Sequence, residues 1–203
     1  MKVIYIISKI LTVFGALNKA FFEHMFCRRY HIAIEDARYF QMSELCGHVY
    51  HELPEKRSAA FGICFFPMLC NFLVGLVFML SGAMRIFYVG DFSFSVSYFY
   101  WGNESLYYVL LLWLGISCWA NLFPLYDDVL NFKEKFYGRN GAGTVAKILA
   151  APVYAVIYAG SFLERTGLTI ITSCAAAFFS PYIIALITPW IASLTPAAAT
   201  TAS

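Results

Sequence analysis

The chain has little charge. Only 13% of its 203 residues are Asp, Glu, Lys or Arg, whereas 61% are hydrophobic; an ordinary soluble domain has about 25% charged residues. This scarcity argues against a soluble domain and indicates an integral membrane protein in contact with a lipid bilayer. Since long uncharged runs leave little chain outside a bilayer, we expect a single integral membrane domain over residues 1–194, followed by a disordered tail over 195–203. We expect no nucleic-acid partner.

Recognisable metal and redox motifs are also missing. The six cysteines are scattered, with no Cys-x-x-Cys pair, which favours buried apolar cysteines over a disulfide or a metal site. His48 and His51 lie three apart on an expected strand and therefore face opposite sides. Pro54 follows His51-Glu52 where a zinc-binding helix would have to continue. We therefore expect no metal and no other cofactor, with zinc as the alternative.

Long uncharged runs predict the membrane spans. Residues 59–84 and 105–126 contain no charged residue, and each run exceeds the roughly 20 residues that a helix needs to cross hydrocarbon. A single helix over the apolar stretch 148–194 would be about twice as long as the hydrocarbon core is thick. Glu164-Arg165-Thr166-Gly167 interrupts it, so we predict a helical hairpin that turns near Gly167, with Pro181 and Pro189 kinking or ending its second helix.

The first apolar run, residues 3–26, contains Lys9, Lys19 and Glu23. We predict a span with a polar face, because such groups must lie against other helices or near an interface. A secretory signal peptide is the alternative, but Lys9 interrupts the apolar core that such a peptide needs. With this run, the fold class is mainly α: a polytopic membrane helical bundle of about five spans.

The segment between the first two expected spans predicts a short membrane-associated β-hairpin. "HIAIEDARYFQM" and "GHVYHEL" are rich in β-branched and aromatic residues and are separated by residues 43–47, a pattern typical of two strands joined by a loop. The stretch "FSFSVSY", residues 92–98, alternates apolar residues with serine and predicts a short interfacial strand.

Basic residues orient the chain. They gather in the loops 27–58 and 127–147, whereas the connection between the second and third spans has only Arg85. Both basic loops should therefore be cytoplasmic. With five spans, the N-terminus and the loop 85–104 would lie outside and the C-terminus inside.

Four features in order resemble a known family. They are Phe26-Cys27 before a basic loop, the strand end "GHVYHELP", the stretch "PMLCN" from Pro67 to Asn71, and "WLGISCWANLFPLYDD" at 113–128. Over about residues 10–137 the chain resembles the site-2-type, zincin-like intramembrane metalloproteases of bacteria and archaea. The resemblance implies a prokaryotic cell membrane, a first span with His-Glu-x-x-His, whose histidines bind zinc and whose glutamate is the base, and a third span with a metal-binding Asp after a Pro.

Only part of that pattern is present. Asn121, Pro124 and then Asp127 or Asp128 stand where the resemblance places the Asn, the Pro and the metal-binding Asp. Aligned on Phe26-Cys27, however, the two histidines of the first span fall on Lys19 and Glu23, and the catalytic glutamate falls on Ala20. Shifting the alignment to use His24 restores no His-Glu-x-x-His motif. The resemblance therefore implies a degenerate catalytic motif.

These residues define a candidate polar intramembrane cluster. Lys19 and Glu23 lie four apart and share a helix face, where they can pair with each other and with Asp127 or Asp128, so that the lysine supplies the charge of a lost metal. Alternatively, Lys19 snorkels to the interface beside the arginines at 28–29 and Glu23 pairs with one of them. The whole candidate cluster consists of Lys19, Glu23, His24, Asn121, Asp127 and Asp128.

Three functional classes follow. The first is a non-catalytic relative of the proteases that binds a membrane protein or a second copy of itself. The second is an active zinc protease with unusual ligands drawn from Glu23, His24, His48 and Asp128. The third is a channel, transporter or accessory subunit of a membrane complex.

A row of small residues predicts a helix contact in the fourth expected span. Ala151, Ala155 and Ala159 recur every four residues, with Gly160 beside them. Such a flat ridge lets the last span or a second copy approach closely. The alternative is that these alanines simply favour a helix.

Overall fold

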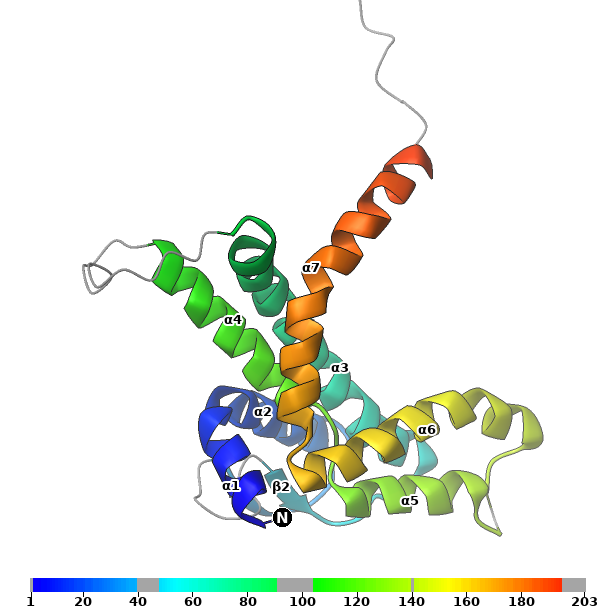
Figure 1. Cartoon of the computed structure of the whole chain (residues 1–203). Coiled ribbons are helices and arrows are strands. Elements are labelled where there is room, and N and C mark those ends of the chain that lie inside the picture. The colour runs from blue at the N-terminus through cyan, green and yellow to red at the C-terminus, as the bar shows by residue number, and fades with distance from the viewer. Residues whose placement is uncertain (1, 40–47, 91–103, 140, 195–203) are drawn as a thin grey trace, which may run out of the picture.

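A computed structural model describes residues 2–39, 48–90, 104–139 and 141–194. These residues form seven α-helices, one π-helical turn and two strands, which confirms the mainly helical prediction (Figure 1). The elements are α1 (Lys2–Leu11), α2 (Val13–Arg29), β1 (Ile34–Arg38), β2 (His48–His51), α3 (Arg57–Ala83), the π-helical η1 (Met84–Tyr88), α4 (Glu104–Ala120), α5 (Tyr126–Tyr137), α6 (Thr144–Thr166) and α7 (Thr169–Leu194). The expected strand at 92–98 and the expected tail 195–203 lie outside the described residues.

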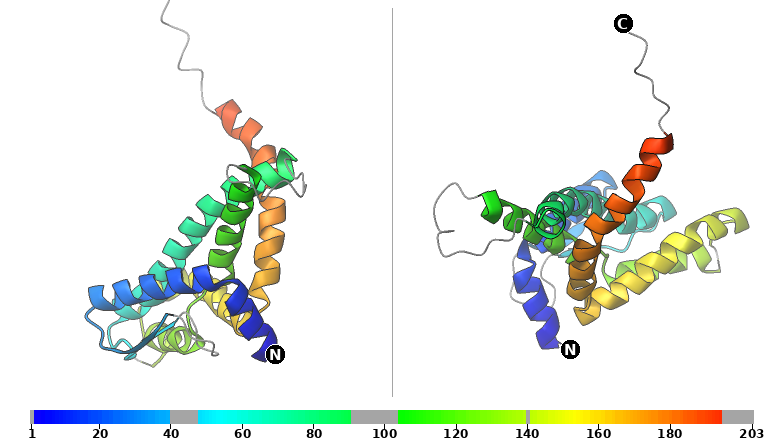
Figure 2. Two further views of the ribbon diagram at one scale, coloured as in Figure 1. Left: turned by 90° about the vertical axis from the view of Figure 1, so that its left-hand side faces the viewer. Right: turned by 45° about the horizontal axis from the view of Figure 1, so that its top comes forward.

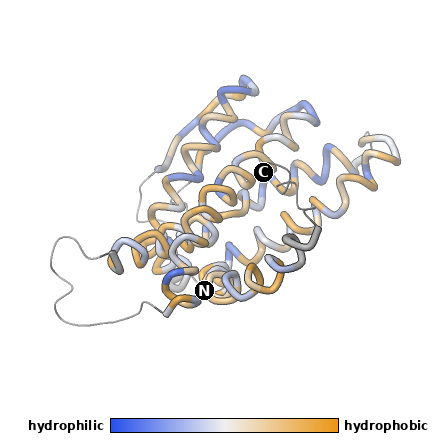
Figure 3. The backbone as a smooth tube through the Cα atoms, turned by 90° about the horizontal axis from the view of Figure 1, so that it is seen from above, coloured by the Kyte–Doolittle hydropathy of each residue, from blue (hydrophilic) through white to orange (hydrophobic). Residues whose placement is uncertain are grey.

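The helices form two groups (Figures 1 and 2). The helices α3, α4 and α7 contact one another and rise away from the lower end of the molecule, and they are called the rising helices below. The helices α1, α2, α5 and α6, with the two strands, lie around the lower ends of the rising helices and are called the base layer. Viewed from above, hydrophobic residues recur along every helix, with hydrophilic residues between them (Figure 3).

Three helices are long and apolar enough to cross a membrane. They are the continuous helix made of α3 and η1 (residues 57–88), the helix α6, and α7 as far as Pro189. The apolar helix α4 has 17 residues and packs along α3. The single first span expected over residues 3–26 is instead two helices, α1 and α2, bent by 87°. By length and composition, three of the described helices could therefore cross a membrane, and five spans are not confirmed.

Side chains of α4 and its C-terminal end hold the bend between α1 and α2. At the bend the N–H of Gly15 donates to the hydroxyl of Ser117 and not to the carbonyl of Leu11, which therefore needs another donor. The amide of Asn121 donates to the carbonyl and the hydroxyl oxygen of Thr12, and the indole of Trp113 donates to the carbonyl of Leu11. The hydroxyl of Thr12 donates to the carbonyl of Ser8. No Pro marks the bend in the sequence, so its signal lies in distant residues.

The strands β1 and β2 pair antiparallel, as the β-branched and aromatic residues of the two segments predicted. Ile34 pairs with His51 and Ala37 with Val49, with an irregularity between Ile34 and Asp36. The hairpin is attached to α2, because the backbone N–H of Val49 donates to Glu23 Oε2 at 3.2 Å. The loop expected at 43–47 lies outside the described residues.

The chain turns at Gly167 between α6 and α7, as predicted, but the two helices do not form the expected hairpin, because α6 runs across the direction of α7 (Figure 1). Gly167 has φ 77°, a left-handed conformation that suits glycine, and its N–H caps the end of α6. Pro181 and Pro189 both lie inside α7, which continues to Leu194, so Pro189 does not end the helix.

Candidate functional site

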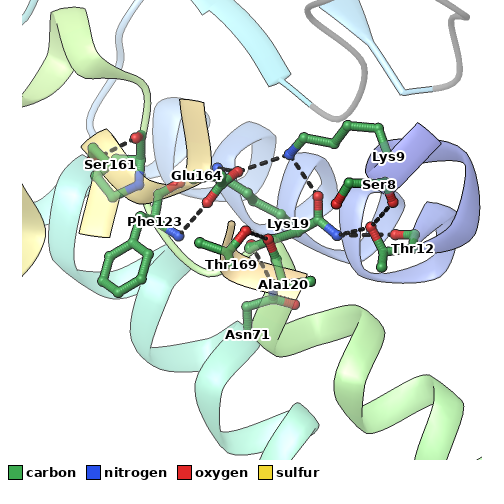
Figure 4. A network of polar contacts seen from close by, with 12 residues as sticks. Ser8, Lys9, Thr12, Lys19, Asn71, Ala120, Phe123, Ser161, Glu164 and Thr169 are labelled. Carbon is green, nitrogen blue, oxygen red and sulfur yellow. Dashed lines mark hydrogen bonds and ion pairs between the residues drawn. The ribbon is translucent and has the colours of Figure 1, made fainter. Parts of the chain in front are cut away.

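The buried carboxylate of Glu164 links several elements of the base layer to one another (Figure 4). Its Oε1 accepts a hydrogen bond from Lys9 Nζ at 2.8 Å and another from Lys19 Nζ at 3.0 Å. Its Oε2 accepts from the backbone N–H of Phe123 at 2.8 Å. Lys19 is 1% exposed, Lys9 4% and Glu164 5%. One carboxylate therefore connects α1, α2 and α6 with the segment that follows α4.

Lys19 points into the protein. Besides Glu164, its ammonium donates to the backbone carbonyl of Phe123, and it lies 4.0 Å from Glu23 Oε1, one helical turn along α2. The spacing of Lys19 and Glu23 predicted this last contact. Among the described residues, Lys19 forms ion pairs with Glu164 and Glu23, and not with Asp127 or Asp128. The expected aspartate partner of Lys19 is thus replaced by Glu164, and burial leaves no room for snorkelling.

Asn121 extends the cluster toward the bend of α1 and α2. Its Oδ1 accepts from Lys9 Nζ at 2.6 Å, and its Nδ2 donates to Thr12 and to the carbonyl of Ser117. The residue is fully buried. Asn121 therefore has a positioning role, linking the end of α4 to the bend and to the charged pair of Lys9 and Glu164.

The non-helical segment between α4 and α5 depends on side chains of other helices. A helix that ends inside a protein exposes carbonyls that need donors. Five carbonyls here accept hydrogen bonds from side chains: Cys118 and Asn121 from Asn71, Ala120 from Thr169, Phe123 from Lys19, and Pro124 from Ser161. The ammonium of Lys19 also lies beyond the C-terminal end of α4, where a positive charge is favourable. The cluster thus fixes the path from α4 to α5.

A second buried pair connects β2 with α5. His51 Nε2 lies 3.5 Å from Asp128 Oδ1, and His51 Nδ1 lies 2.9 Å from the carbonyl oxygen of Glu52. Because a carbonyl only accepts, Nδ1 carries a hydrogen, and the contact between Nε2 and the carboxylate then requires one further proton on the pair. Burial raises the pKa of Asp128 to about 6, against the opposing effect of His51. Asp127, next to it, is exposed.

His24 joins neither cluster. Its ring lies beside that of Tyr39, with 6.0 Å between the ring centroids, and its Nδ1 is buried without a hydrogen-bond partner among the described residues. The side chain of His48, another expected alternative ligand, lies outside the description of the structure.

The donor set does not fit the zinc site that the resemblance implies. An ammonium has no lone pair to give to a metal, and Lys19 stands at one of the two ligand positions. Asp128 faces His51, and Glu23 accepts from Val49. Over the described parts of the chain, no group of three or more His, Cys, Asp or Glu side chains has a geometry that could hold a metal ion.

The small-residue ridge of α6 faces outward. Ala151, Ala155 and Ala159 are all exposed, so the expected packing of this ridge against the last helix is wrong. Gly160 beside them is buried, and a Cβ there would lie 2.1 Å from the ring of Phe123. The packing contact of α6 is therefore made by a different face from the one that the alanines suggested.

Sequence reasoning missed Lys9 and Glu164 as members of the cluster. Glu164 looks like a turn residue because Gly167 follows it, yet it is the only acidic residue between Lys147 and the end of the chain. An isolated carboxylate in so long an apolar stretch is a signal for a buried partner.

We found no match to this chain among protein-family models, curated proteins or solved structures. The similarity to intramembrane metalloproteases therefore stays a prediction that depends on the quoted motifs. The function has to be argued from the geometry of the buried cluster.

Proposed function

We propose that the chain is an integral membrane protein without protease activity, which acts by binding another membrane protein. The observation that carries the non-catalytic part is the contact set of Lys19. At a position where the resemblance implies a zinc ligand, this side chain donates to Glu164 and to the carbonyl of Phe123. The cluster then has the task of holding three helices and the α4–α5 segment together.

The neighbouring positions support the same conclusion. Ala20 stands at the position of the general base and has only a methyl group, which can neither take nor give a proton. Glu23 contacts Lys19 and accepts from the N–H of Val49, so it fastens the β-hairpin to α2. Each side chain has a structural contact in place of a catalytic one.

The proposal places the basic segments 27–58 and 127–147 on the cytoplasmic side of the membrane. Both belong to the base layer or join its elements, and basic residues favour the cytoplasmic side. The hairpin of β1 and β2 then lies at the cytoplasmic membrane surface.

The exposed ridge on α6 supports the partner-binding part. Ala151, Ala155 and Ala159 lie on consecutive turns and are not covered by the described chain. Small residues let two helix backbones approach closely, which favours helix association in lipid. The partner in this proposal is a membrane-embedded helix that packs against these alanines.

The mass of the assembly tests partner binding. The full chain and its Ala155→Leu variant are extracted from their native membrane in mild detergent and weighed by native mass spectrometry. We expect the wild type to carry a partner and Ala155→Leu to lose it, while Val156→Leu, an enlargement at the neighbouring exposed position, keeps it. Equal masses for wild type and Ala155→Leu contradict the proposal; the mass itself tells a second copy from another protein.

Zinc content tests the non-catalytic part separately. We expect purified protein incubated with zinc and then desalted to hold far less than one ion per chain. One ion per chain that is lost in both Glu23→Gln and Asp128→Asn would favour the active metalloprotease instead.

A further inference from the structure

The helix α6 runs across the direction of α7 (Figures 1 and 2). In Figure 1, α5 and α6 extend sideways while α7 rises from the turn at Gly167, and in the left view of Figure 2 α7 still rises while α6 is seen nearly end-on. Two consecutive helices in this arrangement cannot both stand along the membrane normal. At least one of the two must therefore be strongly tilted or lie along the membrane.

The rising helices fix which one crosses. The helices α3, α4 and α7 contact one another, and α3 continues through η1 to Tyr88. Large apolar side chains are exposed on all three helices, as expected of lipid-facing positions, including Val77 of α3, Leu110 of α4 and Ile183 of α7. A membrane crossed by these three leaves α6 lying in its plane.

The outward face of α6 is apolar from end to end. Val145 is 73% exposed, Leu149 71% and Val156 59%, and at 100° per residue these three side chains share one face of the helix. The charged residues Lys147 and Arg165 lie near the two ends of α6. So large an apolar face in water would be costly.

The helix α5 covers the other side of α6. Val129 and Phe132 of α5 form a buried core with Ile157 of α6. The outer side of α5 is polar, with Lys133 and Glu134 exposed. In Figure 1, α5 lies farther than α6 from the upper ends of the rising helices. The pair thus has a polar surface on α5 and an apolar surface on the exposed face of α6. This is the arrangement of an element that lies in a membrane interface.

The distribution of basic residues agrees with this placement. Of the 14 lysines and arginines, only Arg85 lies at the upper end of the molecule, in η1. Every other one lies on the base layer, in the segments that join its elements, or at the lower end of α3. A crossing α6 would carry Arg165 to the outer side, whereas an α6 in the membrane plane keeps it on the cytoplasmic side.

We propose that α6 lies in the cytoplasmic leaflet, with its exposed apolar face against lipid acyl chains, and that α3, α4 and α7 are the helices that cross. The proposal rests on the membrane location proposed above but not on partner binding. It makes one binary statement about topology: the end of α7 lies on the opposite side of the membrane from α5. If α6 and α7 both crossed, as five spans require, the two would lie on the same side.

Topology reporters test this statement in the full chain. Alkaline phosphatase fused after Ser203 should be active and green fluorescent protein at the same place dark, since the end of α7 lies outside. Arg139→Cys, at the exposed end of α5, should resist a membrane-impermeant maleimide in intact cells and react after lysis. A fluorescent fusion together with a protected Arg139→Cys would overturn the proposal, and labelling of Arg139→Cys in intact cells would overturn the cytoplasmic placement.

Depth measurement tests the orientation of α6 directly. Spin labels are placed at Val145→Cys and Val156→Cys, in a chain in which Cys46, Cys70 and Cys174 are replaced by Ala. These sites are eleven residues apart, so they should differ in depth by about 16 Å if α6 crosses, and by a few ångströms if α6 lies in the leaflet.

A matched pair on α7 provides the control. Ile171→Cys and Tyr182→Cys have the same spacing on an exposed helix face and should differ by about 16 Å in the same bilayer. Equal depth differences on α6 and α7 would overturn the proposal. The assembly mass of the unlabelled protein does not enter this experiment, so failure here and failure of partner binding can be told apart.

Discussion

Lys19 and Glu164 lie 145 positions apart in the sequence and form an ion pair of 3.0 Å in which both side chains are buried. The same carboxylate oxygen also accepts from Lys9. One carboxylate therefore compensates two ammonium groups. Because an uncompensated buried charge costs more than the pair contributes, the three residues should differ in how much their removal destabilises the protein.

Glu164→Gln should cost most. It leaves Lys9 and Lys19 close together in a buried site, and the loss should be about 3 to 5 kcal/mol of unfolding free energy, the usual range for breaking a buried pair. Lys9→Met or Lys19→Met alone should cost less, since Glu164 keeps one ammonium partner. The measurement is the unfolding of detergent-solubilised protein followed by circular dichroism.

Double variants make this prediction specific. Adding Lys9→Met to Glu164→Gln should recover part of the stability, because it removes the ammonium that has lost its carboxylate partner, whereas Lys19 still lies 4.0 Å from Glu23. The pair Lys19→Met and Asp128→Asn should be closer to additive, since no ion pair joins these residues. A smaller loss for Glu164→Gln than for both lysine variants would contradict the shared-carboxylate interpretation.

A single hydroxyl group measures the value of supporting the end of α4. Thr169 Oγ1 donates to the carbonyl of Ala120, at the C-terminal end of that helix. Thr169→Val keeps the shape of the side chain and removes this donor, so we expect a loss of about 1 to 3 kcal/mol for an unsatisfied buried carbonyl.

Thr188→Val in the same helix is the matched control. Its hydroxyl donates to the carbonyl of Ile184 within α7, and the side chain is exposed. That carbonyl lies four residues back, where the helix itself supplies a backbone donor, so the change should cost little. Equal losses in the two threonine variants would mean that the support of α4 contributes nothing special.

The sequence was informative where a local signal exists. Gly167 predicted the turn before α7, and the β-branched and aromatic residues around Ala37 and Val49 predicted the β-hairpin. The contact between Lys19 and Glu23 on one helix face also followed from their spacing, whereas their burial was one of two alternatives. In each case the deciding interaction lies within a few residues or between neighbouring strands.

Long-range partners were beyond this reasoning. Nothing in the spacing of Lys19 indicates that its carboxylate comes from Glu164, because the arrangement of α6 against α2 decides it. The bend at Thr12 has no Pro as a signal and depends on Asn121, more than a hundred residues later. Five spans were expected, whereas three helices are long and apolar enough to cross a membrane; apolar length alone does not tell a crossing helix from one that lies along the membrane.

Asp128 should make stability depend on pH. Burial raises its pKa from an ordinary value of 3.8 to about 6. The folded state therefore holds this proton more tightly than the unfolded state. The stabilisation is complete below about pH 4 and is lost as the pH rises through 6, by about 3 kcal/mol at one pKa unit per 1.4 kcal/mol.

Comparison with Asp128→Asn isolates this effect. The amide does not titrate, so the stability of the wild type relative to this variant should fall between pH 4 and pH 6 in thermal unfolding. Asp127→Asn, at the exposed neighbour, should follow the wild type. A constant difference between wild type and Asp128→Asn over this range would show that Asp128 does not titrate there.

The close approach of α3 and α4 should not tolerate a side chain at Gly115. A Cβ at this position would lie 2.4 Å from the backbone nitrogen of Met79 and 2.5 Å from its Cα. Since backbone atoms cannot move aside as a side chain can, Gly115→Ser should force the helices apart and cost about 1 to 3 kcal/mol or more.

Gly143→Ser, where a Cβ meets nothing within 4 Å and serine suits the N-cap of α6, should cost almost nothing. Shortening the neighbour with Met79→Ala should not rescue Gly115→Ser in unfolding experiments, because the nearest atoms belong to the backbone; a full rescue would mean that the side chain of Met79, and not the helix backbone, limits the approach.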